Sequence, residues 1–298
     1  MRLKRWLIGI SVVLALLLGA KYVLLDSAAA PGEPYVIDLP ALHAAAIAGG
    51  PLPTHIEVER LGDFAFPQTL VVAGDGFRMH PMVLLAHRVV WPDRSVIIDT
   101  GLSPADAEVL PGAKAYPAAY QRLERALPNA TNILFTHEHV DHVGGVARAP
   151  NFAAVASKVL MTREQRNGPK LERDKFAAGT LEQLKPLDYS GLYEVAPGVV
   201  LQKAEGHSTG TQLIYVELAS GARYLFIGDI AWSEDNLRLQ RGRPGLLSLI
   251  GKEDREAVAA QVKALAALPK DVHLVIAHDP VAYERDLAAG LFRDGFGD

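Results

Sequence analysis

Three histidines and an aspartate fall within six residues of this chain, between His137 and His142, directly after an apolar run. In extended backbone, residues two apart point to the same side, so His137 and His139 can bind one metal ion at the end of a strand. Asp141 and His142 then fall on the following turn, where they can face a second ion. The pair Gly144-Gly145 lets the backbone bend before the next element. The local spacing therefore predicts a metal site.

Three further candidate ligands each follow a β-rich run: His207, Asp229 and His278. Strands hold the backbone rigidly, and the loops beyond them converge on a common rim that water and substrate can reach. With the first cluster they could form a two-metal site, in which one set holds the first ion, a second set holds the second ion and a carboxylate bridges them: His137, His139 and His207; Asp141, His142 and His278; and Asp229.

Such a site would perform hydrolysis. A water between two ions roughly 3.5 to 4 Å apart loses a proton near neutral pH and becomes a metal-bridged hydroxide nucleophile. Asp141 can take the proton or pass it to a leaving group, which is general acid or base catalysis. Glu138 points away from its neighbours in this segment, so we expect it to be solvated or hydrogen-bonded rather than a ligand. We assign no metal role to five other histidines: His43, His55, His80, His87 and His273.

The motif Thr136-His-x-His-x-Asp-His142, followed by a histidine, an aspartate and a histidine in that order, resembles the metallo-β-lactamase-fold hydrolases. The resemblance covers roughly residues 70–279. It implies an α+β fold, an αββα sandwich of two mixed β-sheets flanked by helices, with the site at one edge of the sheets. The segment Val96-Ile-Ile-Asp99-Thr-Gly101 is similar to an early strand and loop of the family, where the aspartate supports a metal ligand from behind.

The reaction within that family is narrowed by two features. True β-lactamases of the family have a cysteine or serine near the position of Asp229, so this chain does not resemble them. Glyoxalase II-like thioesterases and N-acyl homoserine lactonase-like members share all seven ligands, and the long segment from Val143 to Gly206 favours the lactonase-like group. The resemblance thus implies hydrolysis of a small-molecule ester, with a lactone as the first hypothesis. A thioesterase, a phosphodiesterase and a non-enzymatic metal-binding scaffold are the alternatives.

One residue departs from the lactonase pattern. Lactonases of that group often have a tyrosine three residues after the bridging aspartate, whereas this chain has Trp232. An indole N–H donates one hydrogen bond but cannot act as an acid. We therefore expect Trp232 at the wall of the substrate pocket, and Tyr283 is a second candidate for the donor.

Composition limits the metals and the partners. The chain has 298 residues and no cysteine, so any metal must be held by nitrogen and oxygen. Such ligands suit two divalent ions, for which we expect zinc, although manganese, iron and cobalt also fit. The net charge is −4; residues 1–30 contribute +3, from four basic side chains and one acidic, which leaves −7 for the remaining 268. That charge argues against a nucleic-acid partner.

The N-terminus carries the features of an exported protein. A basic start, Met1 to Arg5, precedes the run Trp6 to Leu25, in which Lys21 is the one charge. Twenty such residues could just span a bilayer, and small residues at 27–30 offer a cleavage site. We expect residues 1–30 to be a signal sequence or membrane anchor with a linker, and residues 31–298 to be the catalytic domain. The protein would be periplasmic, or anchored to the inner membrane facing outward.

Periodicity and turn residues predict the elements between the motifs. The segment Thr162–Leu184 is expected to form one or two surface helices, interrupted at Gly168-Pro169, that serve as a lid over the pocket or as a dimer contact, or present a solvated face. The other expected helices are Leu39–Ala48, Asp106–Val109, Pro117–Leu127, Lys252–Ala267 and Tyr283–Ala288. The expected strands are Ile56–Val58, Leu70–Val72, Met82–Ala86, Ser95–Asp99, Val199–Lys203, Leu213–Leu218, Arg223–Ile227 and Val272–Ala277.

Overall fold

Two β-sheets pack face to face in the computed structural model, which describes residues 2–297 and the side chains of residues 4–297. Within that range, the larger sheet has strands β1 (His55–Pro67), β2 (Met79–Val90), β3 (Ser95–Ile98), β4 (Lys114–Ala115), β5 (Asn132–Leu134), β6 (Val159–Leu160) and β12 (Arg293–Asp294). The smaller sheet has β7 (Leu192–Ala196), β8 (Val199–Lys203), β9 (Gln212–Glu217), β10 (Arg223–Phe226) and β11 (Val272–Val275).

Both sheets mix parallel and antiparallel pairs. The larger follows the order β12-β1-β2-β3-β5-β6, with β4 paired to β1, and the smaller follows β11-β10-β9-β8-β7. β3, β5 and β6 run parallel, and so do β10 and β11. Parallel neighbours place their carboxyl ends at one edge, and the chain segments that carry the candidate ligands leave the sheets at such ends.

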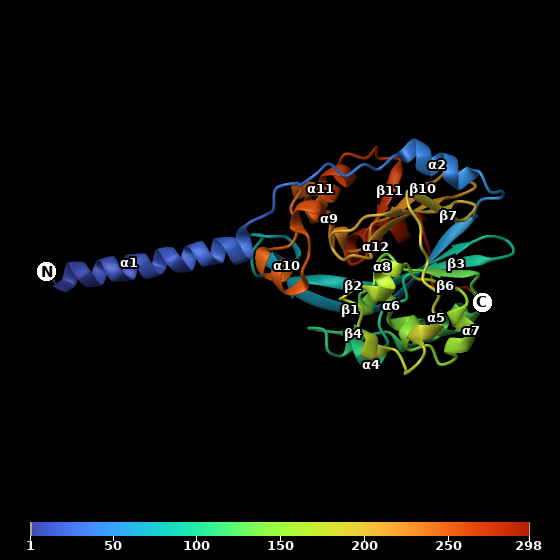
Figure 1. The fold of residues 1–298 in the computed structure, drawn as a ribbon, viewed down its shortest axis with the longest axis horizontal. Coiled ribbons are helices and arrows are strands. Elements are labelled where there is room, and N and C mark those ends of the chain that lie inside the picture. The colour runs from blue at the N-terminus through green and yellow to red at the C-terminus, as the bar shows by residue number, and fades with distance from the viewer. Residues whose placement is uncertain (1, 298) are drawn as a thin grey trace.

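Helices flank the two sheets, and most of them lie on the outer faces (Figure 1). They are α2 (Leu39–Ile47), α3 (Gln68–Val71), α4 (Pro104–Ala107), α5 (Pro117–Ala126), α6 (Val140–Ala147), α7 (Phe152–Ala156), α8 (Arg163–Asn167), α9 (Glu234–Leu239), α10 (Gly245–Gly251), α11 (Arg255–Ala266) and α12 (Pro280–Ala288). Short 3-10 turns are η2 (Leu127–Asn129), η3 (Arg173–Lys175), η4 (Leu181–Gln183) and η5 (Gly228–Ile230). The expected αββα sandwich of two mixed sheets is confirmed.

Alternation along the strands builds three apolar layers. In β3, Ile98 faces the core between the sheets, whereas Ile97 faces the helices outside the larger sheet. In β9, Ile214 faces the central core, and Tyr215 faces α2 and α11 outside the smaller sheet. Successive strand residues point to opposite faces, so a strand covered on both faces is apolar at nearly every position.

The glycine pair after the histidine cluster lies inside α6 and does not form the expected bend. A Cβ on Gly145 would lie 2.5 Å from the Thr100 carbonyl oxygen, and one on Gly144 would lie 2.6 Å from that of Gly101. The glycines therefore let α6 approach the loop after β3 closely. That loop carries Asp99, and α6 carries Asp141 and His142.

Most expected elements occur near their predicted positions, but one expected strand is wrong and the expectation for the segment 162–184 holds only in part. Leu70–Val72 forms the end of the helical turn α3 and the residue after it, because Thr69 donates its N–H to Gly76 O and closes the chain on itself. In the segment Thr162–Leu184, helix α8 ends at Asn167, before Gly168-Pro169. The rest of that segment forms 3-10 turns that bury Leu171 and Phe176 in the outer core, so it is not a helical surface.

A long apolar helix projects from the body. α1 (Arg2–Lys21) continues into the π-helical turn η1 (Tyr22–Asp26) and stands clear of the sandwich (Figure 1). The stretch Lys4–Asp26 is long and apolar enough to cross a membrane, and none of its apolar window is buried. After it, the chain runs without regular structure to α2.

Candidate metal centre

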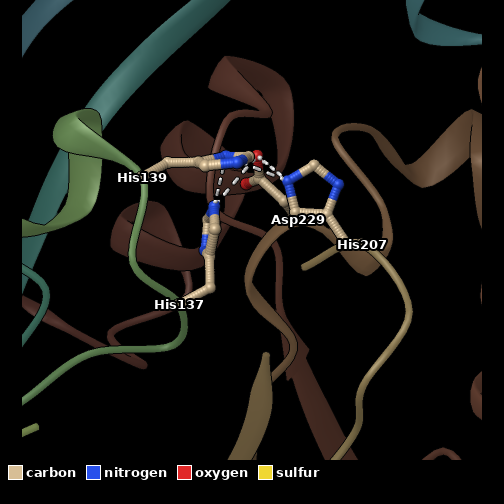
Figure 2. Close-up of side chains that lie close together, drawn as sticks. All are labelled: His137, His139, His207 and Asp229. Atoms are coloured by element: carbon tan, nitrogen blue, oxygen red, sulfur yellow. Dashed lines mark hydrogen bonds and ion pairs between the residues drawn. The ribbon is translucent and has the colours of Figure 1, made fainter. Parts of the chain in front are cut away.

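Three imidazole nitrogens converge at the edge of the sandwich. His139 Nδ1 lies 2.9 Å from His137 Nε2 and 3.1 Å from His207 Nε2. The first two residues stand in the loop between β5 and α6, and His207 stands between β8 and β9, so the two sheets each contribute (Figure 2). One ligand atom from each, with a carboxylate oxygen of Asp229, lies within 4.8 Å of the others, which is a group that could hold a metal ion.

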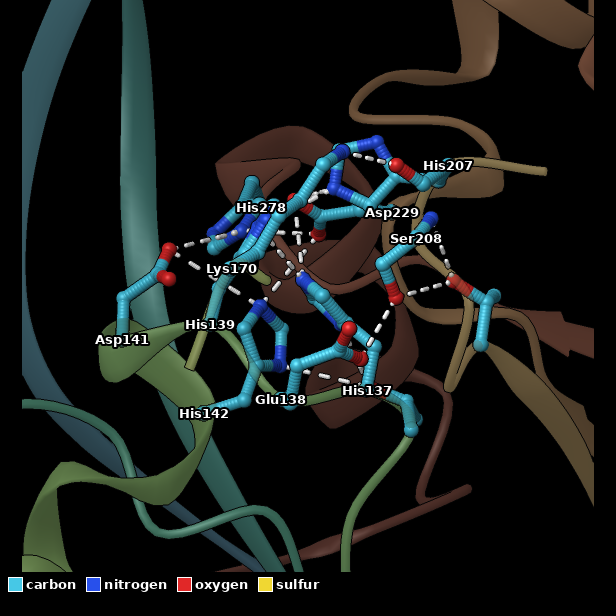
Figure 3. Close-up of polar contacts among 12 residues, drawn as sticks. His137, Glu138, His139, Asp141, His142, Lys170, His207, Ser208, Asp229 and His278 are labelled. Atoms are coloured by element: carbon cyan, nitrogen blue, oxygen red, sulfur yellow. Dashed lines mark hydrogen bonds and ion pairs between the residues drawn. The ribbon is translucent and has the colours of Figure 1, made fainter. Parts of the chain in front are cut away.

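A second group lies beside the first. It consists of Asp141 and His142 from the first turn of α6, His278 from the loop after β11, and again Asp229. Asp141 Oδ2 is 3.5 Å from His278 Nε2 and 3.8 Å from His142 Nε2. The structure thus brings together all seven residues of the expected ligand set, as Figure 3 shows.

Asp229 stands between the two groups. Its Oδ2 lies 3.3 Å from His207 Nε2 and 3.6 Å from His137 Nε2, in the first group. Its Oδ1 lies 3.1 Å from His278 Nε2 and 3.3 Å from His142 Nε2, in the second group. Each group therefore faces its own oxygen of one carboxylate.

The donor set fits divalent cations. Asp229 Oδ1 and His142 Nε2 are buried and make no hydrogen bond within residues 2–297, and buried polar atoms in proteins are rarely left without a partner. Nitrogen and oxygen ligands without sulfur suit zinc and its neighbours. Bound cations would satisfy these atoms and compensate the buried carboxylate.

The charges of the centre are strongly coupled. Burial and the neighbouring His142 lower the pKa of His137 well below its usual value, and burial also lowers that of His139. Burial disfavours the charged form of His142, but the carboxylates of Asp99 and the other nearby aspartates raise its pKa well above its usual value. Burial also opposes the ionisation of Asp229, yet the surrounding imidazoles lower its pKa well below the usual range. The first group therefore favours an anionic carboxylate beside the neutral imidazoles of His137 and His139, which is the form that binds cations.

The model of the metallo-beta-lactamase superfamily matches residues 88–278, which is more than half of the chain. The chain belongs to this superfamily. The match includes all seven residues of the two groups.

Among curated proteins, several N-acyl homoserine lactonases of Bacillus match part of this superfamily member. The N-acyl homoserine lactonase AiiA of Bacillus thuringiensis subsp. kurstaki is 28% identical over 104 residues, which are 35% of this chain and 40% of that protein. An N-acyl homoserine lactonase of Bacillus cereus is 24% identical over 157 residues, 47% of this chain and 61% of that protein. Both alignments cover less than two thirds of the relative.

Solved structures share the fold over a larger part of the chain. A quorum-quenching N-acyl homoserine lactone lactonase superposes with a TM-score of 0.63 and 18% identity, over 78% of this chain and 95% of that one. The dizinc quorum-quenching lactonase AidC gives a TM-score of 0.56 and 15% identity, over 76% and 89%. At these identities the likeness establishes the superfamily fold.

Three of the histidines are oriented by hydrogen bonds on the side away from the two groups. Asp99 Oδ2 lies 2.9 Å from His142 Nδ1, and both its oxygens accept hydrogen bonds from Thr136. Its φ of +56° is the left-handed backbone that aspartate tolerates. His278 Nδ1 lies 2.8 Å from Val83 O. Asp99 thus has the position that the sequence predicted behind a ligand.

The partner of His207 is one that the sequence did not predict. Glu253 Oε2 lies 2.8 Å from His207 Nδ1, and Glu253 also accepts a hydrogen bond from Arg243 Nε at 2.7 Å. Although burial opposes its ionisation, Arg243 and His207 lower the pKa of Glu253 to about 2. Glu253 follows the left-handed residue Lys252 and lies 46 positions from His207, so no local motif marks it.

Glu138 is held away from both groups. Its side chain is fully buried, and it accepts a hydrogen bond from Ser208 Oγ at 2.6 Å. A Cβ on Gly168 or Gly210 would lie within 2.6 Å of its carboxylate oxygens, so both chain segments pack tightly against it. Of the two outcomes expected for Glu138, the structure has the hydrogen-bonded one.

A cavity of about 480 Å³ opens over the two groups. His139, Asp141, Asp229 and His278 form its floor, and its walls are largely apolar. The walls come from β1, from the loop after α8 and from the end of α10, and they include Phe66, Pro169, Lys170, Trp232 and Ile250. Burial lowers the pKa of Lys170, which donates a hydrogen bond to the carbonyl oxygen of His207 (Figure 3). The cavity can accept a largely apolar small molecule.

The two candidate pocket residues have different positions. Trp232 lines the cavity, and its ring stacks on Phe66 with centroids 6.0 Å apart. Tyr283 does not line the cavity: it lies on α12 in the core between the sheets, with Arg60 over its ring. The expectation that Tyr283 replaces the missing donor therefore does not agree with the structure.

Proposed function

We propose that the protein is a dinuclear metal-dependent hydrolase of ester-like substrates and that lactones are its substrate class. The position of Asp229 carries the dinuclear part, because one carboxylate oxygen faces each ligand group. Such a carboxylate is suited to bridge two ions. The lactone part is supported by the curated relatives, which are named N-acyl homoserine lactonases, and by the apolar cavity over the groups.

The ligand assignment follows the two groups. His137, His139, His207 and Asp229 would hold one ion, and Asp141, His142, His278 and Asp229 would hold the other. Zinc is the ion we propose, because the donors are nitrogen and oxygen and a structural neighbour is named a dizinc lactonase. Two such ions supply Lewis acidity toward a carbonyl oxygen and lower the pKa of water.

Asp141 is the general acid or base in this proposal. Its side chain is 23% exposed and borders the cavity, so it meets both water and substrate. A carboxylate there can accept a proton from the attacking water and return it to the leaving-group oxygen. Glu253 and Asp99 hold His207 and His142 in place while this happens.

Trp232 would orient the substrate. Its buried indole N–H makes no hydrogen bond within residues 2–297, and Arg243 lies over its ring at 4.9 Å. The ring offers an apolar wall and one unused donor, but no acid. Proton transfer to the leaving group therefore stays with Asp141.

The proposal also covers the organisation of the chain. Residues 1–30 would be a signal or anchor with its linker, and residues 31–298 the catalytic domain on the outer side of the inner membrane. It is supported by the apolar helix, of whose membrane-length window nothing is buried, and by the basic residues at its N-terminal end, which favour the cytoplasmic side.

Metal analysis of the purified full chain tests the function first. We expect about two ions per chain. Asp229→Asn keeps the shape of the side chain and removes the charge, and it should lose metal and lower kcat/KM by about 100-fold or more, because even partners of ligands are worth about 10–100-fold. The matched control is Asp286→Asn, since Asp286 is equally buried and pairs with His273 at 2.8 Å, on α12. Full metal content and activity in Asp229→Asn would refute the bridging role.

A substrate panel separates the chemical classes. Lactone, thioester and phosphodiester substrates are compared on metal-loaded protein, with and without a chelator. We expect chelator-sensitive hydrolysis that is fastest with lactones. A faster thioester or phosphodiester would reassign the substrate class. The absence of hydrolysis in all three classes, with metal bound, would favour the scaffold alternative.

A further inference from the structure

The end of α10 exposes two apolar side chains beside the cavity. Leu249 and Ile250 are each 72% exposed. Ile250, with the following Gly251 and Lys252, also lines the cavity whose floor holds the two ligand groups. The apolar tip of α10 is therefore part of the cavity's rim, and an uncovered apolar rim marks an interaction surface.

The same helix packs against the base of the long N-terminal helix. A Cβ on Gly245, the first residue of α10, would lie 2.7 Å from the carbonyl oxygen of Val23 in η1. In Figure 1, α1 leaves the body next to α10 and points away from it. The rim of the cavity and the exit of the apolar helix are thus on one side of the molecule.

Hydrogen bonds fix the base of that helix to the catalytic domain. The Leu25 carbonyl oxygen accepts from Gly74 N at 3.0 Å and from Thr69 Oγ1 at 3.2 Å. Arg241 Nη2 donates a hydrogen bond to Asp26 O at 2.6 Å. The backbone carbonyl oxygen of the residue after Asp26 accepts a hydrogen bond from an arginine of α11. A helix fixed at its base by several bonds sets the orientation of the domain relative to a membrane.

A second exposed apolar pair lies in the turn 74–79, which begins at Gly74 and ends on the first residue of β2. Phe77 is 62% exposed and Met79 is 54% exposed, and the basic Arg78 stands between them. Because the Gly74 N–H donates a hydrogen bond to the carbonyl oxygen of Leu25, this turn also starts at the base of the N-terminal helix. Apolar side chains interleaved with basic ones are typical of segments that rest in the lipid headgroup region.

The length of the helix sets the depth of these segments. The stretch Lys4–Asp26 has 23 residues, or about 34 Å of helix, close to the ~30 Å hydrocarbon core of a bilayer. Lys21 pairs with Asp26 at 2.5 Å, so its charge lies at the outer end of the helix and not in mid-membrane. The base of the helix, and with it α10 and the turn 74–79, would therefore lie at the outer surface.

We propose that the tip of α10 and the turn 74–79 rest in the outer lipid surface, so that the cavity opens onto the bilayer and takes ester substrates with apolar acyl chains from the lipid phase. The partner is the lipid surface itself. The docking part stands on the helix and the exposed residues, whereas the delivery of substrate rests on the proposed hydrolase function.

Site-specific labelling tests the docking. The chain has no cysteine, so Ile250→Cys gives a single attachment point for an environment-sensitive fluorophore. Ile47→Cys is the matched control, since Ile47 is also an exposed isoleucine at the end of a helix, α2, on the far side from α1 (Figure 1). In full-length protein reconstituted in phosphatidylcholine and phosphatidylglycerol vesicles, brominated lipids should quench the label at 250 and leave that at 47 unchanged. A label at 250 that brominated lipids do not quench overturns the docking, whether it stays in water or is covered by a second copy.

A charged substitution on α10 tests whether substrate reaches the cavity from the lipid phase. Leu249 does not line the cavity, and Leu249→Glu places a carboxylate at the proposed lipid contact. Hydrolysis of a long-chain acyl lactone dissolved in the vesicles should fall about tenfold, the factor for withdrawing one leucine side chain from an apolar phase, whereas hydrolysis of a short, water-soluble lactone should not change. Equal effects on both substrates overturn the delivery. If the unmodified chain hydrolyses neither lactone, the proposed function is overturned. The label at position 250 would still show whether the docking occurs.

Discussion

Glu253 holds His207 as Asp99 holds His142. In both pairs a carboxylate oxygen lies within 2.9 Å of the imidazole nitrogen that faces away from the ligand groups. Such a bond fixes the tautomer and the ring orientation and makes the other nitrogen a better metal ligand. Arg243 in turn keeps Glu253 in place, because its guanidinium is buried and donates to that carboxylate.

Replacing Glu253 with glutamine should weaken the binding of the ion in the His207 group more than the binding of the other ion. Glu253→Gln keeps the shape of the side chain but removes the negative charge that faces both His207 and Arg243. We expect the affinity of one ion to fall about 10–100-fold, measured by competition with a coloured chelator. Glu205→Gln is the control, because Glu205 is an exposed glutamate two residues before His207.

The same experiment distinguishes positioning from a general structural role. If Glu253 only stabilised the fold, the metal-free variant would unfold at a lower temperature while binding both ions with unchanged affinity. Glu253→Asp, which restores the charge at a slightly different reach, should recover part of the lost affinity. Unchanged affinity in Glu253→Gln would contradict the orienting role.

At this scale the sequence predicts what is local. The metal-ligand cluster from His137 to His142 could be recognised because its ligands lie within six consecutive residues. Glu253 could not, because its role depends on a turn that brings it to His207 from 46 positions away. Tyr283 was placed in the pocket on its residue type alone, and the packing of α12 against the central core decides otherwise.

Among the elements, one carboxylate ties three segments together near the cavity. Asp106 in α4 accepts hydrogen bonds from Arg148, which follows α6, at 2.9 and 3.1 Å. It also accepts from Lys175 in η3 at 2.9 Å and from Ser103 at 2.7 Å. These bonds secure α6, whose first turn carries Asp141 and His142.

Acid should remove this stabilisation. Arg148 and then Lys175 hold the pKa of Asp106 well below its usual value, so its contribution is present above the unfolded pKa near 4 and is lost as the pH falls toward the folded value. Asp106→Asn should lower the free energy of unfolding at pH 7 by about 1–2 kcal/mol, and its difference from the unmodified chain should shrink below pH 4.

An exposed pair provides the control for the acid effect. Asp188 also bonds an arginine, Arg163, but the two side chains are 57% and 55% exposed. Solvent screens such a pair, so Asp188→Asn should hardly change the unfolding free energy at any pH. Denaturant titrations between pH 3 and 7 measure both variants, and an equal loss in the two would contradict the role of Asp106.

At the scale of elements, the sequence predicted those strands and helices whose apolar pattern matches their burial. The strands β8 to β10 and the helix α5 occur within a residue of their expected bounds, because both faces of the strands are covered and the helix is amphipathic. The segment after α8 differs from the predicted helices because its apolar residues pack into the outer core from irregular backbone. Irregular backbone leaves no periodic pattern in the sequence. α10 was not predicted at all, since its seven residues are too short and too apolar to show a pattern.

For the whole molecule, removing metal should lower the thermal stability. The two groups gather five imidazoles and two carboxylates, and only the folded chain holds them together. Ions at 100 times their dissociation constant add about 2.7 kcal/mol to the free energy of unfolding, or several degrees in Tm at this size. Scanning fluorimetry before and after chelation, with metal added back, measures the shift. It should be smaller in Asp229→Asn, and an unchanged Tm in the unmodified chain would contradict a preformed metal centre.

The two ligand groups have a mixed origin that extends the site well beyond its own loops. Each group takes residues from the larger sheet, through the segment 137–142, and from the smaller sheet, through His207, Asp229 or His278. The distance between the sheets therefore fixes the distance between the ligands. It is set by side chains such as Ile98, Leu134, Ile214 and Phe226, which lie in the central core. The thickness of the sandwich thus sets the ligand spacing, and a change of side-chain volume at these core positions would alter that spacing as well as the packing.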